Sequence, residues 1–175
     1  MLALRSLLFV CTLVTAAQAQ NAGARFPRFE DYRVTEIFHG KPAPPKLVRP
    51  ADRLFRTQIR EAAAEGPNFA GHYTIAQWGC GGGCLSIALV DAKDGAVHAA
   101  PFKVLGWGMP GLMYEGKYSA DQDQFQPVEF RLESNLLIVR GCPEEKNCAS
   151  YFYEWTGSLF KLVQKAAAVG PVSGK

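Results

Sequence analysis

Residues 69–90, FAGHYTIAQWGCGGGCLSIALV, decide how this chain folds. On both sides of the glycines, large apolar side chains alternate with small or polar ones, which is the pattern of half-buried β-strands. The three glycines between Cys80 and Cys84 can turn the chain sharply, because glycine adopts backbone conformations closed to other residues. The stretch therefore predicts two strands, 69–76 and 85–90, joined by a glycine-rich turn.

Further segments with the same period predict the rest of an antiparallel sheet. The composition of DAKDG at 91–95 is that of a turn leading into a second hairpin strand. The remaining strands are expected at 96–102, 128–132, 136–140, 150–155 and 159–165. Between them lies a long irregular stretch, 103–126, of a length typical of functional loops. With one helix before the strands, the expected fold class is α+β: an antiparallel sheet of hairpins and meander with one N-terminal helix, in a single compact domain.

The helix is predicted over residues 51–65, with Asp52 as N-cap and Gly66-Pro67 as its end. Its apolar face is expected to comprise Leu54, Phe55, Ile59, Ala62 and Ala63. Three arginines, Arg53, Arg56 and Arg60, fall on the other side at spacings of three and four residues. They form either a solvated face, where nearby carboxylates reduce the repulsion between the like charges, or an anion-binding stripe.

The first nineteen residues have the features of a secretory signal: Arg5, an apolar core at 7–14, and Ala17-Gln18-Ala19 as a cleavage site. We expect cleavage after Ala19 and a periplasmic or secreted protein with no transmembrane segment. A lipoprotein anchored at Cys11 is disfavoured, because bulky residues stand where a lipobox needs small ones. The expected organisation is a signal peptide at 1–19, an extended Pro-rich arm at 20–50, the α+β domain at 51–166 and a frayed tail at 167–175.

The formal net charge is +3 and no segment holds five consecutive basic residues, which argues against nucleic acid as the partner. Once Cys11 has left with the signal, four cysteines remain, and an oxidising compartment favours two disulfides among them. The local pairing joins Cys80 with Cys84 and Cys142 with Cys148. The crossed pairings stay open. A loop as short as 80–84 removes little entropy from the unfolded chain, so this bridge would shape a site more than stabilise the fold.

Cys80 and Cys84 could instead be reactive, with His72 as the base of a cysteine hydrolase or as neighbour of a redox pair. However, redox motifs separate their cysteines by two residues at the start of a helix, and here three glycines follow a strand. A metal site lacks a second close pair of ligands, and a phosphate loop would have to open a helix. We therefore expect no metal and no cofactor.

Aromatic side chains beside glycine-rich loops are typical of surfaces that bind a sugar, a peptide or a partner protein. Their alternative role is ordinary core packing. The candidate binding surface comprises His72, Trp78, Gly81, Gly82, Gly83, Trp107, Tyr114 and Tyr118.

The order GPNFAGHY at 66–73, WGCGGGC at 78–84, and YEW at 153–155 before FKL at 160–162 resembles a group of small exported bacterial proteins. The resemblance implies a bacterial, periplasmic setting, and it brings no catalytic residue, since we know no established activity for that group. Together with the residues, it predicts a non-enzymatic binding or envelope-associated domain whose partner is a protein, a peptide or a glycan. The alternative is a thiol-dependent enzyme that uses Cys80 or Cys84 with His72.

Overall fold

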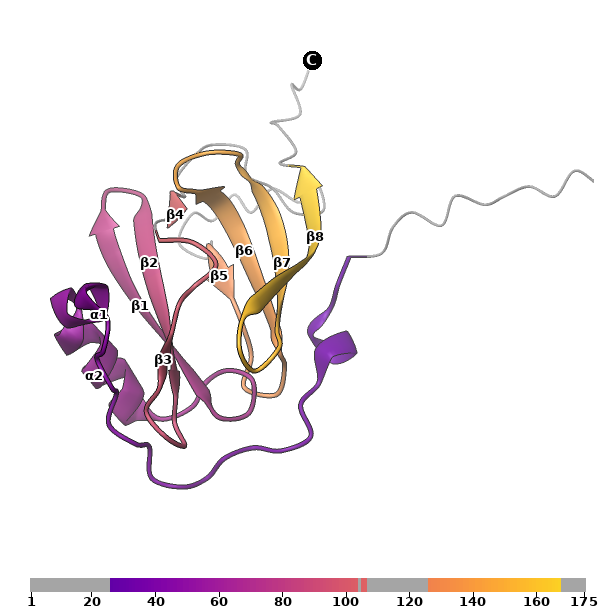
Figure 1. The fold of residues 1–175 in the computed structure, drawn as a ribbon. Coiled ribbons are helices and arrows are strands. Elements are labelled where there is room, and N and C mark those ends of the chain that lie inside the picture. The colour runs from indigo at the N-terminus through magenta and orange to yellow at the C-terminus, as the bar shows by residue number, and fades with distance from the viewer. Residues whose placement is uncertain (1–25, 104, 107–125, 168–175) are drawn as a thin grey trace, which may run out of the picture.

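A computed structural model describes residues 26–103, 105–106 and 126–167, and in it eight strands form one antiparallel sheet beside a few short helices (Figure 1). The main strand order is β1-β2-β4-β6-β7-β8, with β3 on β2 and β5 on β6. The strands are β1 Tyr73–Gly81, β2 Cys84–Asp91, β3 Val97–His98, β4 Leu105–Gly106, β5 Val128–Glu129, β6 Leu136–Pro143, β7 Ala149–Trp155 and β8 Phe160–Ala167. The helices are η1 Phe29–Tyr32, α1 Pro50–Leu54 and α2 Arg56–Glu65. The described chain is thus mostly β with some helix, and the expected antiparallel sheet is present.

Strands β1 and β2 form a long antiparallel hairpin at one edge of the sheet. Its register runs from Tyr73 opposite Asp91 to Gly81 opposite Cys84. The prediction that the first strand begins at residue 69 is wrong, because the backbone at Ala70 and Gly71 has positive φ and turns the chain before Tyr73. Asn68 closes this turn: its side-chain carbonyl accepts from Ile75 N–H at 2.8 Å, and its amide donates to Ile75 O at 3.3 Å.

The sheet curls on itself, so that strands far apart in its order share one core. Tyr73 of β1 and Trp155 of β7 pack edge to face, with ring centroids 5.3 Å apart, although β2, β4 and β6 lie between the two strands. The alternation of side chains explains which residues meet there. The main core gathers Phe69, Tyr73, Ile75, Ile87, Leu89, Phe102, Leu105, Val128, Leu137, Val139, Tyr151, Tyr153 and Trp155.

Two covers protect the other face of the sheet. Helix α2 covers the β1–β2 hairpin, where Ile59 and Ala63 pack against Ala88 and Val90 of β2. The segment around η1 covers β6 and β7, where Phe26 stacks on Phe152 with centroids 5.7 Å apart. Both covers come from residues that precede the first strand.

The segment predicted as one helix over 51–65 is divided at Phe55, whose φ of −109° and ψ of 27° leave the helical region. Leu54 is exposed, so the expectation that it belongs to the apolar face is wrong. Asp52 is not the N-cap either: Arg49 holds that position. Asp52 lies in the third position of α1, is buried, and accepts from the Arg49 guanidinium at 2.7 and 2.9 Å.

Residues 33–49 form an extended strap that crosses one end of the sheet (Figure 1). Backbone hydrogen bonds join Phe38 N–H to Gly71 O at 2.8 Å and Lys46 N–H to Gly95 O at 2.7 Å. At both glycines φ is positive, +80° at Gly71 and +78° at Gly95, and a Cβ would collide with a strap carbonyl. Close approach of the strap therefore requires glycine at these two turns.

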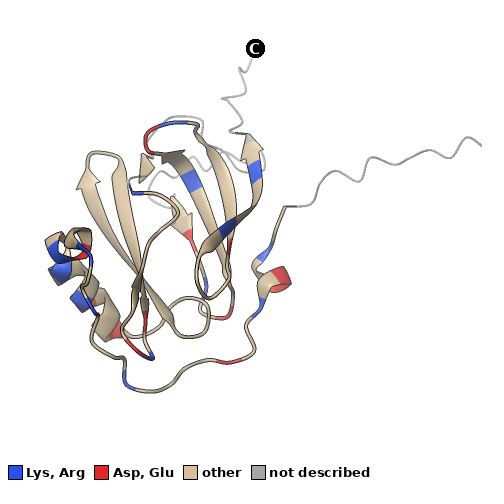
Figure 2. Cartoon of the chain, viewed as in Figure 1, with Lys and Arg blue, Asp and Glu red and all other residues tan. Residues whose placement is uncertain are grey.

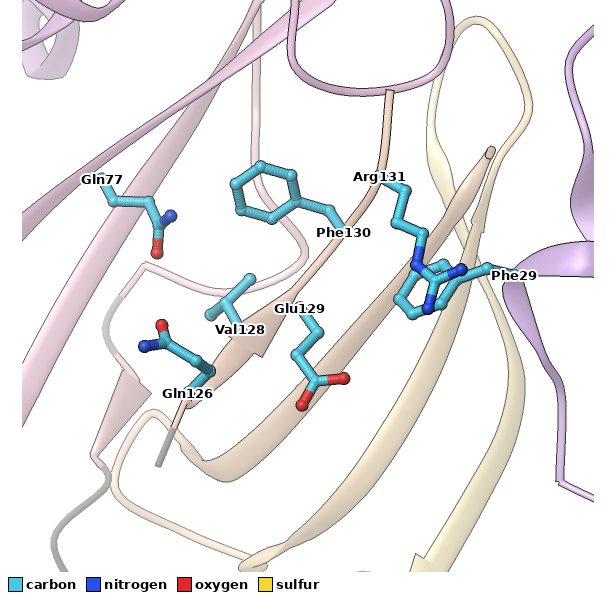
Figure 3. Close-up of a pocket in the computed structure, with 7 residues that line it drawn as sticks. All are labelled: Phe29, Gln77, Gln126, Val128, Glu129, Phe130 and Arg131. Atoms are coloured by element: carbon cyan, nitrogen blue, oxygen red, sulfur yellow. The ribbon is translucent and has the colours of Figure 1, made fainter. Parts of the chain in front are cut away.

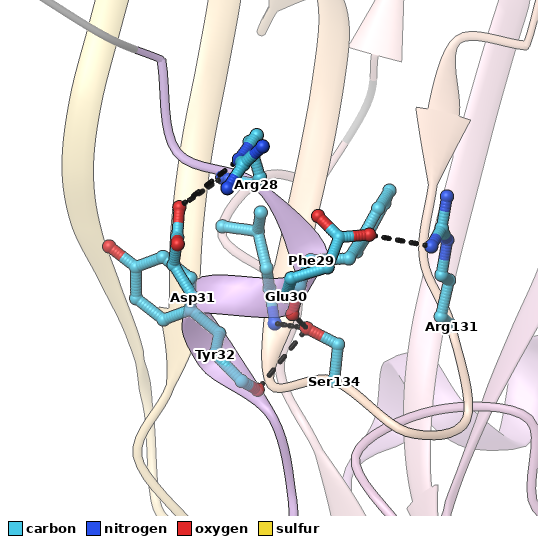
Figure 4. A network of polar contacts seen from close by, with 8 residues as sticks. Arg28, Phe29, Glu30, Asp31, Tyr32, Arg131 and Ser134 are labelled. Atoms are coloured by element: carbon cyan, nitrogen blue, oxygen red, sulfur yellow. Dashed lines mark hydrogen bonds and ion pairs between the residues drawn. The ribbon is translucent and has the colours of Figure 1, made fainter.

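The chain before the strap is joined to the β5–β6 connection by a polar network (Figure 4). The Ser134 hydroxyl is within hydrogen-bonding distance of Phe29 O at 2.9 Å and Tyr32 O at 3.2 Å, and it accepts from Leu136 N–H at 3.2 Å. Arg131 pairs with Glu30 at 3.2 Å and lies over the Phe29 ring. These contacts order η1 although none of its side chains is fully buried.

Several strands differ in length from those predicted. Strand β3 covers only two residues of 96–102, and β5 two of 128–132, whereas β6 extends to Pro143. Strand β4 was missed, since a two-residue strand carries no detectable period. The aromatic residues expected in the 103–126 loop, and the tail from 168 onward, lie outside the described residues.

Candidate functional site

Both cysteine pairs lie at disulfide distance at the same end of the sheet. Cys80 pairs with Cys84, with Cα atoms 5.1 Å apart, and Cys142 pairs with Cys148. Gly106 of β4 lies between the two bridges, because its register partners are Cys84 on β2 and Cys142 on β6. The structure thus has the local pairing. We call this the disulfide end.

The tip of the β1–β2 hairpin is an exposed loop at the disulfide end. Cys80, Gly81 and Gly82 are exposed, and a Cβ built on either of the two glycines would meet nothing within 4 Å. Gly83 completes the turn with a φ of +66°. Apart from the paired cysteines, the loop therefore offers only backbone groups to solvent.

Trp78 has a structural role that the sequence left open. Its ring stacks on Phe55, with centroids 4.8 Å apart and 29° between the planes, and it packs against the cluster of α2 and β2. It is half-buried under the break between the helices. In the structure, Trp78 therefore packs in the cluster between the helices and the sheet. Trp107, Tyr114 and Tyr118 lie outside the described residues, so their part in a binding surface stays a prediction.

His72 lies at the opposite end of the hairpin from the two cysteines. It directly precedes Tyr73, where β1 begins, while Cys80 is near the end of that strand. Eight residues of extended chain span roughly 25 Å. The structure therefore does not bring His72 to the sulfurs, and the two halves of the expected thiol–imidazole pair are apart.

The neighbour of His72 is Asp91, whose Oδ2 is 3.6 Å from the imidazole Nε2. The His72 ring also lies against Tyr73, with ring centroids 4.1 Å apart. Burial lowers the pKa of His72 below its ordinary value and outweighs the Asp91 carboxylate, which acts to raise it. Among the described residues, no hydroxyl or thiol forms a hydrogen bond with this imidazole.

An open groove of about 550 Å³ contains His72, and we call it the strap groove. Its floor includes the buried rings of Tyr73 and Trp155. Its rim is polar and comes from four distant parts of the chain: Arg33, Thr35 and Glu36 of the strap, Lys93 after β2, Asn135 before β6, and Glu154 and Thr156 at the end of β7. Sequence reasoning identified only His72 among these residues, because no local pattern marks side chains that meet only through the fold.

Charges of both signs are left available in the strap groove. Lys93 Nζ is 3.9 Å from Glu36 Oε1, a contact between exposed groups that is worth little. Within the described ranges, neither Arg33 nor Glu154 is in an ion pair. Arg33 and Glu154 therefore border the groove without a described ion-pair partner.

A second hollow, of about 310 Å³, lies between Gln77 and Gln126 (Figure 3). Its charged residues already have protein partners: Glu129 accepts from Arg140, and Arg131 pairs with Glu30. Gln126 is the first residue described after position 106, so the rim of this hollow is incomplete in the described chain. The strap groove is the better candidate site, because its lining residues are all described and two of its charged residues have no described ion-pair partner.

The three arginines predicted as an anion stripe lie on the helices at the β1 edge of the sheet, where Figure 2 shows Lys and Arg gathered on α1 and α2. All three are exposed. In the part of the chain that is described, no group of three or more His, Cys, Asp or Glu side chains could hold a metal ion. No described helix is long and apolar enough to cross a membrane.

No known family, no curated protein and no solved structure matches this chain.

Proposed function

We propose that this protein is an exported, disulfide-bonded binding domain of the cell envelope, without catalytic activity of its own. The proposal includes removal of residues 1–19 and a periplasmic or secreted location, as the signal-like N-terminus suggests. Two cysteine pairs at disulfide distance are compatible with that setting.

The observation that carries the proposal is the strap groove. It is an open space of about 550 Å³ over an apolar floor, with Arg33 and Glu154 unpaired among the described residues. The floor supplies apolar contact and the polar rim supplies groups that can fix the orientation of a ligand, which are the two elements of a binding site. A ligand that carries both a cationic and an anionic group, as a short peptide does, satisfies both side chains.

A binding role also agrees with the surroundings of His72. Nucleophilic catalysis needs a hydroxyl or thiol within hydrogen-bonding reach of the base. In the described chain the charged partner of His72 is Asp91, and both cysteines of the hairpin are paired at the other end of β1. The thiol-dependent enzyme would require reduction of that bridge and a different base, so we do not favour it.

The test is a titration of the isotope-labelled exported protein with a mixture of short zwitterionic peptides and, separately, with neutral oligosaccharides, followed by NMR. We expect the peptides to shift signals of Thr35, Asn135 and Thr156, which line the groove. Arg33→Gln and Glu154→Gln should each weaken binding about tenfold, since a charged hydrogen bond contributes roughly 1.5 kcal/mol or more.

Glu61→Gln is the matched control, because it makes the same change of charge as Glu154→Gln at an exposed position of α2 outside the groove. It should leave affinity unchanged. Peptide-induced shifts confined to the Gly81–Gly83 turn, or unchanged affinity in both groove variants, would contradict the proposed site.

A further inference from the structure

Two large apolar side chains protrude from the helical edge of the molecule. Val48 is 72% exposed and Leu54 is 76% exposed, more than any other large hydrophobic residue in the described chain. Leu54 is the last residue of α1 and is exposed, whereas the ring of the next residue, Phe55, packs against Trp78. Exposure of two such neighbours on one short segment suggests contact with something other than water.

Arginines lie close to these apolar side chains along the chain. Arg53 donates from Nε to Leu47 O at 3.2 Å and from Nη2 to Val48 O at 3.0 Å, so its guanidinium lies beside Val48. Arg56 donates to Arg53 O at 3.4 Å. Both side chains use backbone carbonyls, which do not neutralise their charge.

Two exposed carboxylates, Glu61 and Glu65, lie on α2, but neither forms an ion pair with these arginines in the described chain. Within the described residues, Arg53, Arg56 and Arg60 take part in no ion pair. The one carboxylate of α1, Asp52, is buried and is already paired with Arg49 at 2.7 Å. The exposed side chains of this segment therefore combine apolar groups with three cations. We use the name α1 face for Val48 before α1, Arg53 and Leu54 in α1, and Arg56 and Arg60 in α2.

We propose that the α1 face docks the protein on a bilayer surface that contains anionic phospholipid. Leu54 and Val48 enter the boundary between headgroups and acyl chains, and the arginines lie at the level of the lipid phosphates. This division of roles is the one by which amphipathic surface segments bind membranes. Binding is peripheral and reversible, because only two apolar side chains are inserted.

A lipid surface fits the α1 face better than a protein partner does. A stable protein interface buries about 800 Å² on each partner, more than five side chains supply. A bilayer, in contrast, accepts single protruding apolar side chains and attracts cations over its whole surface. The proposal is independent of the strap groove, which is lined by different residues.

A second exposed apolar group lies on the β7–β8 hairpin and provides the control. Leu159 is 57% exposed, and Lys161 lies two residues after it. Strand β8 is the opposite edge of the sheet from β1, beside which the helices lie. Substitution at these two positions removes one apolar side chain and one positive charge at a different edge of the molecule.

The experiment is co-sedimentation of the exported protein, with its N-terminus verified by mass, with vesicles of equal parts phosphatidylglycerol and phosphatidylcholine. Vesicles of phosphatidylcholine alone and buffer with added inorganic phosphate are the comparison arms. We expect binding to the anionic vesicles that weakens with salt. Arg56→Gln with Arg60→Gln should lower the partition coefficient about twentyfold and Leu54→Ser about tenfold.

Leu159→Ser with Lys161→Gln should stay within about twofold of the unmodified protein, because these residues are outside the proposed contact. Melting temperatures of all variants establish that each is folded. Absence of vesicle binding, equal loss in the control, or equal binding to phosphatidylcholine overturns the proposal. Competition by inorganic phosphate at constant ionic strength would indicate a free-anion site, and binding to an acidic peptide without vesicle binding would indicate a protein partner; both also overturn it.

Discussion

The imidazole Nε2 of His72 lies 3.6 Å from Asp91 Oδ2, and burial still lowers the pKa of His72 below its ordinary value of 6.5. The unfolded chain therefore binds a proton at this residue more readily than the folded one does. As pH falls through 6.5 towards the lowered pKa, the folded protein should lose stability, and as pH rises back above 6.5 it should regain it.

His72→Gln should remove this part of the pH dependence, which denaturant unfolding at several pH values measures. Asp91→Asn should lower the pKa of His72 further, because the carboxylate acts to raise it and the Asn side chain retains an oxygen for Lys93 N–H. Imidazole NMR reports this pKa directly. A rise of the His72 pKa in Asp91→Asn would contradict the assignment.

The four cysteines described should carry no free thiol when the protein is produced in an oxidising compartment. Digestion without reduction should give one cross-linked product containing Cys80 and Cys84, and another containing Cys142 and Cys148, by mass spectrometry. Alkylation of the unfolded, unreduced protein should modify none of the four. A peptide linking the two hairpins, or an alkylated Cys80, would contradict the local pairing and reopen the thiol-dependent alternative.

Gly95→Ala should loosen the strap, because the new Cβ collides with Pro44 O. Gly157→Ala is the matched control: φ is similarly positive, +89° against +78°, but nothing lies within 4 Å. Both should lose about 1–2 kcal/mol from the left-handed backbone. The Gly95 variant should lose more, and tryptic cleavage after Lys46 should become faster in it alone. Equal losses would mean that the strap contributes little.

Asp52→Ala should destabilise the protein by about 1.5–3 kcal/mol, since the buried carboxylate binds the Arg49 guanidinium and backbone N–H. Asp31 stands in the same relation to Arg28 at η1, but its side chain is 45% exposed against 6% for Asp52. Asp31→Ala should therefore cost at most about 1 kcal/mol. Denaturant unfolding of both variants measures the difference, and equal costs would refute a special role for the buried pair.

The strands with strong alternation could be predicted from sequence, and the central hairpin is the clearest case. Its turn at Gly81–Gly83 and the strand from Cys84 onward follow from local chemistry. The start of β1 could not be predicted, because the alternation continues through Phe69 and Gly71 while the backbone already turns there. Periodicity reports which side a residue faces and not whether its backbone is extended.

The candidate site was less predictable than the sheet. His72 and Cys80 are close in sequence, which suggested a common site, yet an extended strand moves them to opposite ends of the hairpin. Arg33 and Glu154 are far apart in sequence and line one groove only because the sheet curls and the strap crosses it. Likewise, the break between α1 and α2 at Phe55 carries no evident signal in the sequence.

The contacts of η1 have a consequence for the order in which the molecule assembles. Phe29 is bonded to Ser134 across 105 positions, and Phe26 stacks on Phe152. A segment that leaves the ribosome early thus acquires its partners only after β6 and β7 exist. Such long-range closure is slow, because the entropy of the intervening chain must be lost first. Until then, Leu136, Ile138 and Phe152 are without their cover, and the chain is most vulnerable to aggregation in that interval.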